Sequence, residues 1–188
     1  MRRIETDLPG VCLLEPQVFS DDRGFFLESF HQRKLAELGI RDEWVQDNHA
    51  RSVRGTLRGL HYQLKHPQAK ICRVSRGTVL DVAVDIRRGS PTFGRWVGAE
   101  LSGENHRQVY IPVGFAHGYV VLSETADFLY KCSDFYYADD NYGIAWNDPQ
   151  IGIEWPLDGA PLLSAKDAST PPLSEIRPGD LPDYGNVK

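Results

Sequence analysis

Thr78-Val79-Leu80-Asp81-Val82-Ala83-Val84-Asp85-Ile86 is the stretch of sequence that decides the fold class. Its residues fall into two alternating sets, as the side chains of a β-strand alternate between the two faces of a sheet. Turn signals bound the stretch on both sides, with Arg76-Gly77 before it and Arg88-Gly89-Ser90-Pro91 after it. The pattern therefore predicts a β-strand over residues 78–86. One set is Val79, Asp81, Ala83 and Asp85, and the other is Leu80, Val82, Val84 and Ile86.

Working outward from this strand, we expect further strands separated by turns and no helix between them. A single short helix is expected at 32–38, ended by Gly39. From Ala138 onward the chain is rich in Pro, Asp and Gly, and we expect loops over one end of the structure. Strands at this spacing favour a sandwich or barrel over a parallel α/β sheet. The other expected strands are 11–14, 25–30, 71–75, 96–101, 109–112, 118–122 and 126–132.

Composition narrows the class of protein. A length of 188 residues with 41% apolar content suits one domain with a sizeable core. A formal net charge of −5 argues against general binding to nucleic acid or to anionic membranes. No apolar run is long enough to cross a bilayer, and Met1–Ile4 does not begin a signal peptide. The three widely spaced cysteines, Cys12, Cys72 and Cys132, favour a reducing cytoplasm.

A cationic cluster surrounds His61 in the first half of the chain. His61 lies in the stretch Arg54–Gln63, and the nearby cations predict a site for a small anion. Imidazole is the one side chain there that gains and loses a proton near neutral pH, so His61 is the candidate base. The alternative is a histidine that is merely packed in a strand. The cations are Arg54, Arg58, Lys65, Lys70 and Arg73.

A second stretch, Ile111–Gly118, contains the pattern Pro-x-Gly-x-x-His and ends in His117-Gly118. This pattern resembles the second motif of the cupins, which are double-stranded β-helix (jelly-roll) proteins. In most cupins that histidine binds a metal together with a His-x-His pair and a glutamate. The corresponding first stretch here, Leu60-His61-Tyr62, has no second histidine two positions on. We therefore expect no metal.

Further motifs narrow the resemblance to one cupin branch, the dTDP-4-dehydrorhamnose 3,5-epimerase family, over nearly the whole chain. This resemblance implies an all-β double-stranded β-helix with short peripheral helices. It also implies a single domain, 1–188, with N-terminal strands and a helix (1–45), a jelly-roll core (46–135) and a loop-rich region covering the site (136–188). The motifs are Asp22–Ser29, Gln46-Asp47-Asn48, Leu57–His61, Lys70, Ile111–Gly118, Tyr130-Lys131, Trp146–Pro156 and Leu163–Asp167.

The resemblance also implies a reaction, the inversion of C3 and C5 of a dTDP-linked 4-keto-6-deoxyhexose without any cofactor. Both carbons lie beside the C4 ketone, so the reaction needs a base, a cation at the enolate oxygen and a proton donor on the opposite face. By resemblance His61 is the base, Asp167 orients it, Lys70 faces the C4 oxygen and Tyr130 donates the proton. Without the resemblance, Asp167 reads as a turn cap, Lys70 as a solvated edge residue and Tyr130 as core.

The resemblance assigns the nucleotide end of the substrate to a second group of residues. Arginine forks suit the diphosphate, and amide and carboxylate groups suit the thymine and ribose edges. Tyr136 matches the tyrosine that stacks on thymine, although Phe135-Tyr136-Tyr137 leaves the register open by one residue. Tyr142 stands where many members carry an acidic residue. The substrate-binding residues implied are Arg23, Glu28, Gln46, Asp47, Asn48, Arg58, His117, Tyr136 and Lys166.

The family further implies a twofold homodimer in which the segment bearing Arg23 and Glu28 crosses to the neighbouring site. The alternative is that this segment forms a core strand of its own barrel. Competing functions also remain open. They are a mono-epimerase or ketoisomerase acting on a related dTDP-sugar, a metal-dependent cupin oxygenase and a non-catalytic sugar-binding cupin. No nucleic-acid or membrane partner is expected.

Overall fold

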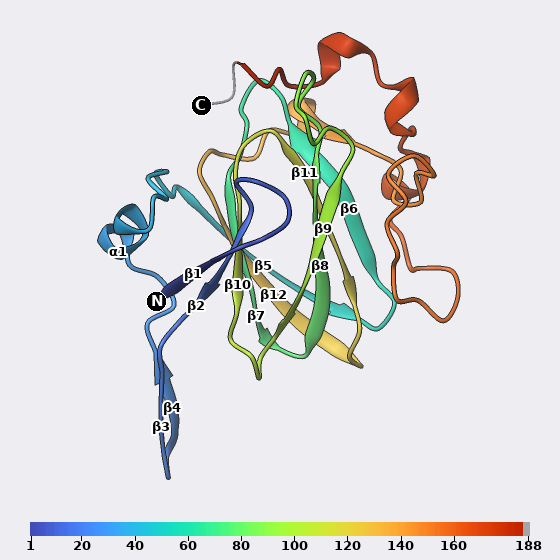
Figure 1. The fold of residues 1–188 in the computed structure, drawn as a ribbon. Coiled ribbons are helices and arrows are strands. Elements are labelled where there is room, and N and C mark those ends of the chain that lie inside the picture. The colour runs from blue at the N-terminus through green and yellow to red at the C-terminus, as the bar shows by residue number, and fades with distance from the viewer. Residues whose placement is uncertain (186–188) are drawn as a thin grey trace.

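Two facing antiparallel sheets form the body of the molecule (Figure 1). A computed structural model describes residues 1–185. The first sheet has the order β1-β2-β10-β7-β12-β5 and the second β13-β6-β11-β8-β9. The strands of the first are β1 Arg2–Glu5, β2 Cys12–Glu15, β10 Gln108–Ile111, β7 Lys70–Arg76, β12 Thr125–Cys132 and β5 Gln46–Val53. Those of the second are β13 Asn141–Gly143, β6 Leu57–Gln63, β11 Phe115–Val121, β8 Thr78–Asp85 and β9 Trp96–Ser102.

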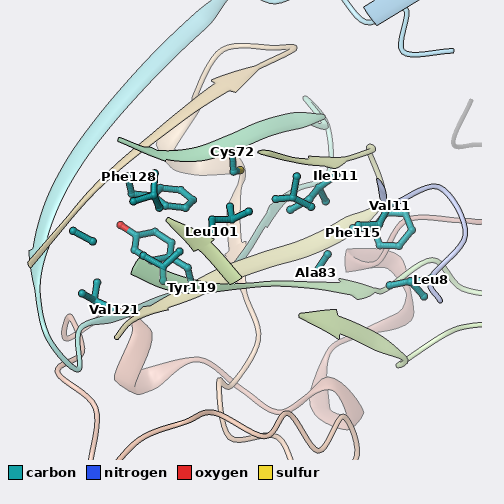
Figure 2. Packing of buried hydrophobic residues seen from close by; sticks show 14 residues of the cluster. Leu8, Val11, Cys72, Ala83, Leu101, Ile111, Phe115, Tyr119, Val121 and Phe128 are labelled. Carbon is teal, nitrogen blue, oxygen red and sulfur yellow. The ribbon is translucent and has the colours of Figure 1, made fainter. Parts of the chain in front are cut away.

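The main hydrophobic core fills the space between the two sheets (Figure 2). Phe128 of β12 stacks on Tyr119 of β11, with ring centroids 3.9 Å apart, and so joins one sheet to the other. Strand β8 contributes to two cores because its successive side chains point to opposite faces of the sheet. Val79 and Ala83 belong to the core between the sheets. Val82 and Val84, which alternate with them along the strand, pack in a second core on the outer face of the second sheet.

The second core is closed by the C-terminal part of the chain, which runs along the outside of the second sheet (Figure 1). Ile144, Ile151, Leu173 and Leu181 supply its buried side chains there. This segment is mostly irregular, with the short 3-10 turns η2 Asp167–Ser169, η3 Leu173–Glu175 and η4 Pro178–Asp180. A further turn, η1 Ala138–Asp140, precedes β13. Apolar anchors at intervals therefore hold a loop-rich segment against the sheet that bears His61.

The single α-helix, α1 Gln32–Glu37, covers the outer face of the first sheet. His31 caps its N-terminus by accepting the backbone N–H of Lys34, and Gly39 follows it with a φ of +87°. Glycine adopts that left-handed conformation without a Cβ penalty, and so ends the helix. Leu35 is fully buried among outward-facing residues of β2 and β7. Within the described residues, no helix is long and apolar enough to cross a membrane.

A two-stranded hairpin, β3 Val18–Asp21 and β4 Gly24–Leu27, stands away from both sheets (Figure 1). Its aromatic side chains are open to solvent, with Phe25 61% and Phe26 70% exposed. Two large phenyl groups at the surface of a projecting arm are unusual for an isolated monomer. The alternative that this segment is a core strand of its own barrel is therefore wrong.

The predicted all-β fold with a short peripheral helix is confirmed. The predicted helix at 32–38 is α1, and every strand predicted between 71 and 132 is present within a few residues of its expected bounds. Only 25–27 of the predicted strand 25–30 is extended, in β4. The strands expected from the sequence did not include β1, β3, β5, β6 or β13. The three-part division of 1–188 remains a prediction, and residues 186–188 lie outside the described residues.

Candidate active site

The centre of the candidate site is a hydrogen bond between His61 of β6 and Asp167 at the start of η2. Nε2 of His61 lies 2.6 Å from Oδ1 of Asp167. The Asp167 side chain is only 5% exposed, whereas His61 is 31% exposed and open to a cavity. Ser164 fixes the turn by accepting the backbone N–H of Asp167. Residues 106 positions apart in the sequence are thus held as one pair.

The hydrogen bond also decides which nitrogen of His61 is free. Burial acts to raise the pKa of Asp167, but the hydrogen bond from His61 and that from Ser164 outweigh it, so the pKa lies below its ordinary value. An ionised carboxylate only accepts hydrogen bonds, so Nε2 of His61 carries the proton that it shares with Asp167. Nδ1 is then left with a lone pair and can take a proton from a substrate.

Lys70, Tyr130, Arg58 and His117 line a cavity of about 250 Å³ with this pair. Lys70 begins β7 and Tyr130 lies on the neighbouring strand β12, so both face the cavity from the first sheet. Burial raises the pKa of the Tyr130 hydroxyl well above its usual value, which keeps it protonated at neutral pH. His61 faces the same cavity from the second sheet. The imidazole and the phenol therefore line one cavity from different sheets.

A second lobe of about 280 Å³ continues from the first and shares His61, Lys70 and Tyr130 with it. Its other residues include Gln46, Asn48 and Tyr136, as the sequence predicted. The phenol oxygen of Tyr136 accepts a hydrogen bond of 3.1 Å from Asn141. The ring of Tyr136 is half exposed. It offers a flat face at the edge of a polar lobe, which suits a heterocyclic base.

Two side chains hold the loop that carries Tyr136. Gln63 accepts the backbone N–H of Tyr137 at 2.8 Å and donates to the carbonyl of Phe135 at 3.0 Å. Asp140, 2% exposed, accepts the three successive backbone N–H groups of residues 64–66. These bonds tie the segment after β6 to the aromatic loop 135–137 and so fix the position of Tyr136.

His117 is buried, with 7% of its surface exposed. Its Nε2 is 2.9 Å from Oδ2 of Asp81 and 3.8 Å from Sγ of Cys72. Burial lowers the pKa of His117 even though Asp81 acts to raise it. Within residues 1–185, these three residues are the one group of histidine, cysteine and acidic side chains whose ligand atoms are close enough to share a metal ion.

Three of the predicted substrate-binding residues do not reach this cavity within one chain. Arg23 lies at the tip of the projecting hairpin, 90% exposed, and pairs with Asp21. Glu28 pairs with Lys34 of α1 at 2.8 Å. Asp47 points from the opposite face of β5 and pairs with Lys131. The remaining predicted residues, Gln46, Asn48, Arg58, His117, Tyr136 and Lys166, line the two lobes with the four predicted catalytic residues.

Sequence reasoning missed Asp81, Gln63, Asp140 and Asn141. A signal for Asp81 was present, because the alternation in 78–86 places it in the same set as Val79 and Ala83, which face the core. An acidic side chain on a core-facing set needs a buried partner, here His117. The other three act through backbone hydrogen bonds and contacts between loops, for which the sequence holds no periodic signal.

Comparison with known proteins gives one consistent result. A family profile described as dTDP-4-dehydrorhamnose 3,5-epimerase matches residues 5–175. The dTDP-4-dehydrorhamnose 3,5-epimerase of Pseudomonas aeruginosa is 58% identical over 168 residues, which cover 89% of this chain and 93% of that protein. The enzyme of Salmonella typhimurium is 54% identical over 174 residues, which cover 92% of this chain and 95% of that protein.

Solved structures agree with the sequence matches. A dTDP-6-deoxy-D-glucose-3,5-epimerase of Legionella pneumophila, in complex with dTDP-4-keto-L-rhamnose, superposes with a TM-score of 0.96. It is 52% identical, and the match covers 97% of this chain and 98% of that one. A 3′-monoepimerase of Streptomyces bikiniensis, in complex with dTDP-quinovose, has a TM-score of 0.89 at 37% identity, with 96% and 92% of the two chains covered.

Proposed function

Since this chain belongs to the dTDP-4-dehydrorhamnose 3,5-epimerase family, we propose that it inverts C3 and C5 of dTDP-4-dehydro-6-deoxy-D-glucose. The product is dTDP-4-dehydro-L-rhamnose, a precursor of L-rhamnose for cell-surface polysaccharide. The observation that carries the proposal is the placement of His61 and Tyr130 on opposite sheets across one cavity. Inversion of a carbon needs a base on one face and an acid on the other.

His61 acts as the base in this mechanism. Its free Nδ1 removes the proton from C3 or C5, which the neighbouring C4 ketone makes acidic. Asp167 holds the ring and stabilises the imidazolium that forms, through the 2.6 Å hydrogen bond at Nε2. The C–H electron pair moves into the ring to give an enolate whose charge rests largely on the C4 oxygen.

Lys70 and Tyr130 complete the reaction. The ammonium of Lys70 stabilises the enolate oxygen, an effect worth about 3–4 kcal/mol for a well-placed donor in a site of this kind. Tyr130, protonated at neutral pH, then delivers its proton to the opposite face of the carbon and inverts it. Water restores both groups before the second carbon reacts. The chemistry requires no redox or organic cofactor.

The second lobe binds the nucleotide in this proposal. Tyr136 stacks on thymine, and Gln46 and Asn48 offer amide groups to its edge. Arg58, Lys166 and His117 lie along the first lobe, where the cations suit the diphosphate and His117 the sugar. Gln46 already uses its side-chain oxygen on the backbone N–H of Tyr136 and its amide nitrogen on Oδ1 of Asn48, so its second amide hydrogen is the group left for the base.

The functional unit is a homodimer in this proposal. Arg23 and Glu28 lie far from the cavity of their own chain, on or beside the exposed hairpin β3–β4. A twofold exchange of hairpins brings them to the partner's site and covers Phe25 and Phe26. We place the enzyme in the cytoplasm, and the free thiols of its three cysteines support a reducing compartment.

The test is solvent exchange. The purified protein is incubated with dTDP-4-keto-6-deoxy-D-glucose in heavy water without added metal, and the sugar is analysed by NMR and mass spectrometry. Deuterium at both C3 and C5, lost in His61→Ala, is the expected result. Binding of the nucleotide sugar without deuterium uptake at either carbon would overturn the enzymatic proposal.

The second candidate is a mono-epimerase acting on a related dTDP-sugar. The observation that favours it is the likeness to the 3′-monoepimerase of Streptomyces bikiniensis, whose fold differs little from that of this chain. The same experiment decides between the two. Inversion and label confined to one carbon would support the second candidate, and inversion at both carbons would exclude it.

A further inference from the structure

Cys72, Asp81 and His117 form a buried cluster that the proposed mechanism does not use as a unit. They come from three strands, β7, β8 and β11, and all three residues are at most 7% exposed. Nε2 of His117 is the common point, 2.9 Å from Asp81 and 3.8 Å from Cys72. Their possible ligand atoms all lie within 4.8 Å of one another. Figure 2 shows Cys72 in the core between the sheets, close to Phe128 and Leu101.

The donor set suits a thiophilic divalent ion. Zinc binds cysteine sulfur at about 2.3 Å, and imidazole nitrogen and carboxylate oxygen at about 2.0–2.2 Å, with three protein ligands and one open position in many sites. An ion between the three side chains reaches all of them with small rotations. A thiolate and a carboxylate carry two negative charges, which a divalent ion balances. The occupied site is therefore neutral, as a dry interior requires.

The cluster adjoins the substrate cavity at His117, which lines the lobe that also contains His61 and Lys70. This is the side from which an ion would enter. The cluster also differs from the metal site expected of a cupin. Only His117 belongs to the Pro-x-Gly-x-x-His motif, and Cys72 and Asp81 lie on strands outside both motif stretches.

We propose that Cys72, Asp81 and His117 bind a single zinc-like divalent ion, and that its occupancy inhibits the enzyme. The inhibition rests on the proposed function of His61, which is the direct cross-strand neighbour of His117 between β6 and β11. An ion bound to Nε2 of His117 takes that side chain away from the substrate in the lobe that both histidines line. The ion is a regulator or inhibitor here, and the epimerisation itself proceeds without it.

The first measurement of the test needs no substrate. Full-length protein treated with a chelator is titrated with cobalt(II), and the thiolate-to-cobalt charge-transfer absorption is recorded. We expect saturation at about one equivalent and displacement of the cobalt by zinc. In the activity assay, zinc is expected to lower turnover, and chelator to restore it. The chelator-treated enzyme is expected to be fully active.

Matched cysteine variants locate the site. Cys72→Val keeps the side-chain volume and should remove the absorption band, and should raise the zinc concentration for half-inhibition at least about tenfold. Cys12→Val is the control, because Cys12 is equally buried but packs beneath α1 on the outer face of the first sheet. It should keep both the band and the inhibition. If Cys72→Val folds poorly, Asp81→Asn provides the same loss of cobalt binding.

Three results would overturn the proposal: no charge-transfer band in the wild type, an unchanged band in Cys72→Val, or stoichiometric binding without inhibition. Failure of the proposed function is separate from these results. In that case the cobalt band and its loss in Cys72→Val are still observed, but heavy-water exchange is absent from the metal-free enzyme.

Discussion

At the residue scale, the direction of one hydrogen bond determines much of the chemistry. Because Asp167 is an ionised acceptor at Nε2, His61 presents Nδ1 to the cavity, and Tyr130 presents a protonated hydroxyl from the opposite sheet. In the proposed mechanism His61 is therefore ready to accept a proton and Tyr130 to donate one before a substrate binds. Because the two roles differ, substitution of each residue should give a different result.

Tyr130→Phe should separate exchange from inversion. His61 can still remove a proton and return one from solvent to the same face, so deuterium should enter the sugar while its configuration is retained. Inversion should fall by about 10²-fold or more, the usual contribution of a positioned acid. NMR of the sugar in heavy water measures both quantities. Equal losses of exchange and inversion would contradict the assignment of Tyr130 as the donor only.

Asp167→Asn should lower kcat by about 10²-fold or more with a smaller change in KM, because the imidazolium loses its anionic partner. It should also change the dependence of stability on pH. The pKa of Asp167 is lowered in the folded protein, so its stabilising effect is complete above the ordinary value of 3.8 and is lost as the pH falls further. The difference in unfolding free energy between wild type and variant should therefore shrink below that pH.

The sequence predicted the residues of the site unevenly. His61 stood out as the histidine of the stretch Arg54–Gln63 within a cationic cluster, but Asp167, Lys70 and Tyr130 were assigned by resemblance, since each alone has the pattern of an ordinary turn, edge or core residue. Asp81 was visible in the alternation of its strand. Gln63 and Asp140 could not be found in this way, because their partners are backbone groups brought near by loop packing.

At the element scale, the loop that carries Tyr136 and the contact between β6 and β11 shape the site. The strands expected at 78–86 and 126–132 are found within one residue of those bounds, as β8 and β12. Both were predictable because their segments are largely buried and rich in apolar residues. Strand β5 was missed because its outward face is polar, and β13 because it has only three residues. Tertiary pairing, rather than intrinsic preference, makes these two segments strands.

Asp140→Asn should loosen the loop 135–137 and weaken nucleotide binding. One of its carboxylate oxygens becomes an NH2 group, which cannot accept the backbone N–H groups among residues 64–66 that bond to that oxygen now. KM for the dTDP-sugar should rise about tenfold while kcat changes little, since a hydrogen bond to a charged group contributes about 1.5–3 kcal/mol. Asp139→Asn is the matched control, because Asp139 is adjacent and exposed. Steady-state kinetics with both variants decides the point.

Gly59→Ala should destabilise the fold beside the site. A Cβ at Gly59 would lie 2.5 Å from the Cα of Gly118 across the β6–β11 pair, and the φ of Gly59 is +129°. Gly24 at the hairpin tip is the control, since its φ is +125° but no atom from elsewhere in the chain would lie within 4 Å of a Cβ there. We expect Gly59→Ala to lose about 1–3 kcal/mol more than Gly24→Ala, measured by thermal or denaturant unfolding. Equal losses would show that backbone conformation alone matters.

At the scale of the whole molecule, the residues proposed to bind substrate do not all line one cavity of one chain. His61, Asp167, Tyr130 and Tyr136 line its two lobes. Arg23, predicted to bind substrate, lies instead on a projecting arm. The sequence suggested such an arm through the run Phe25-Phe26-Leu27, but it could not decide between an arm and a core strand, because both need apolar side chains.

Mixed dimers of Arg23→Ala and His61→Ala should recover activity that neither variant has alone. If the hairpins are exchanged, a mixed dimer places both lesions in one site and leaves the other site intact. Random pairing makes half of the dimers mixed, so the recovered activity should approach about a quarter of the wild-type value. Co-expression with two affinity tags and an activity assay provide the measurement. Recovery is not expected if each hairpin serves its own chain.

The exposed arm has a consequence for how the enzyme behaves on dilution. If the hairpins are exchanged as proposed, each catalytic centre exists only while two polypeptides remain associated, so specific activity should depend on protein concentration. Below the dissociation constant of the dimer, rate per milligram should fall although every chain stays folded, and added excess of an inactive His61→Ala chain should restore it by lending its hairpin. Each chain then acts as an activator of its partner, because the hairpin that it supplies completes the partner's active site.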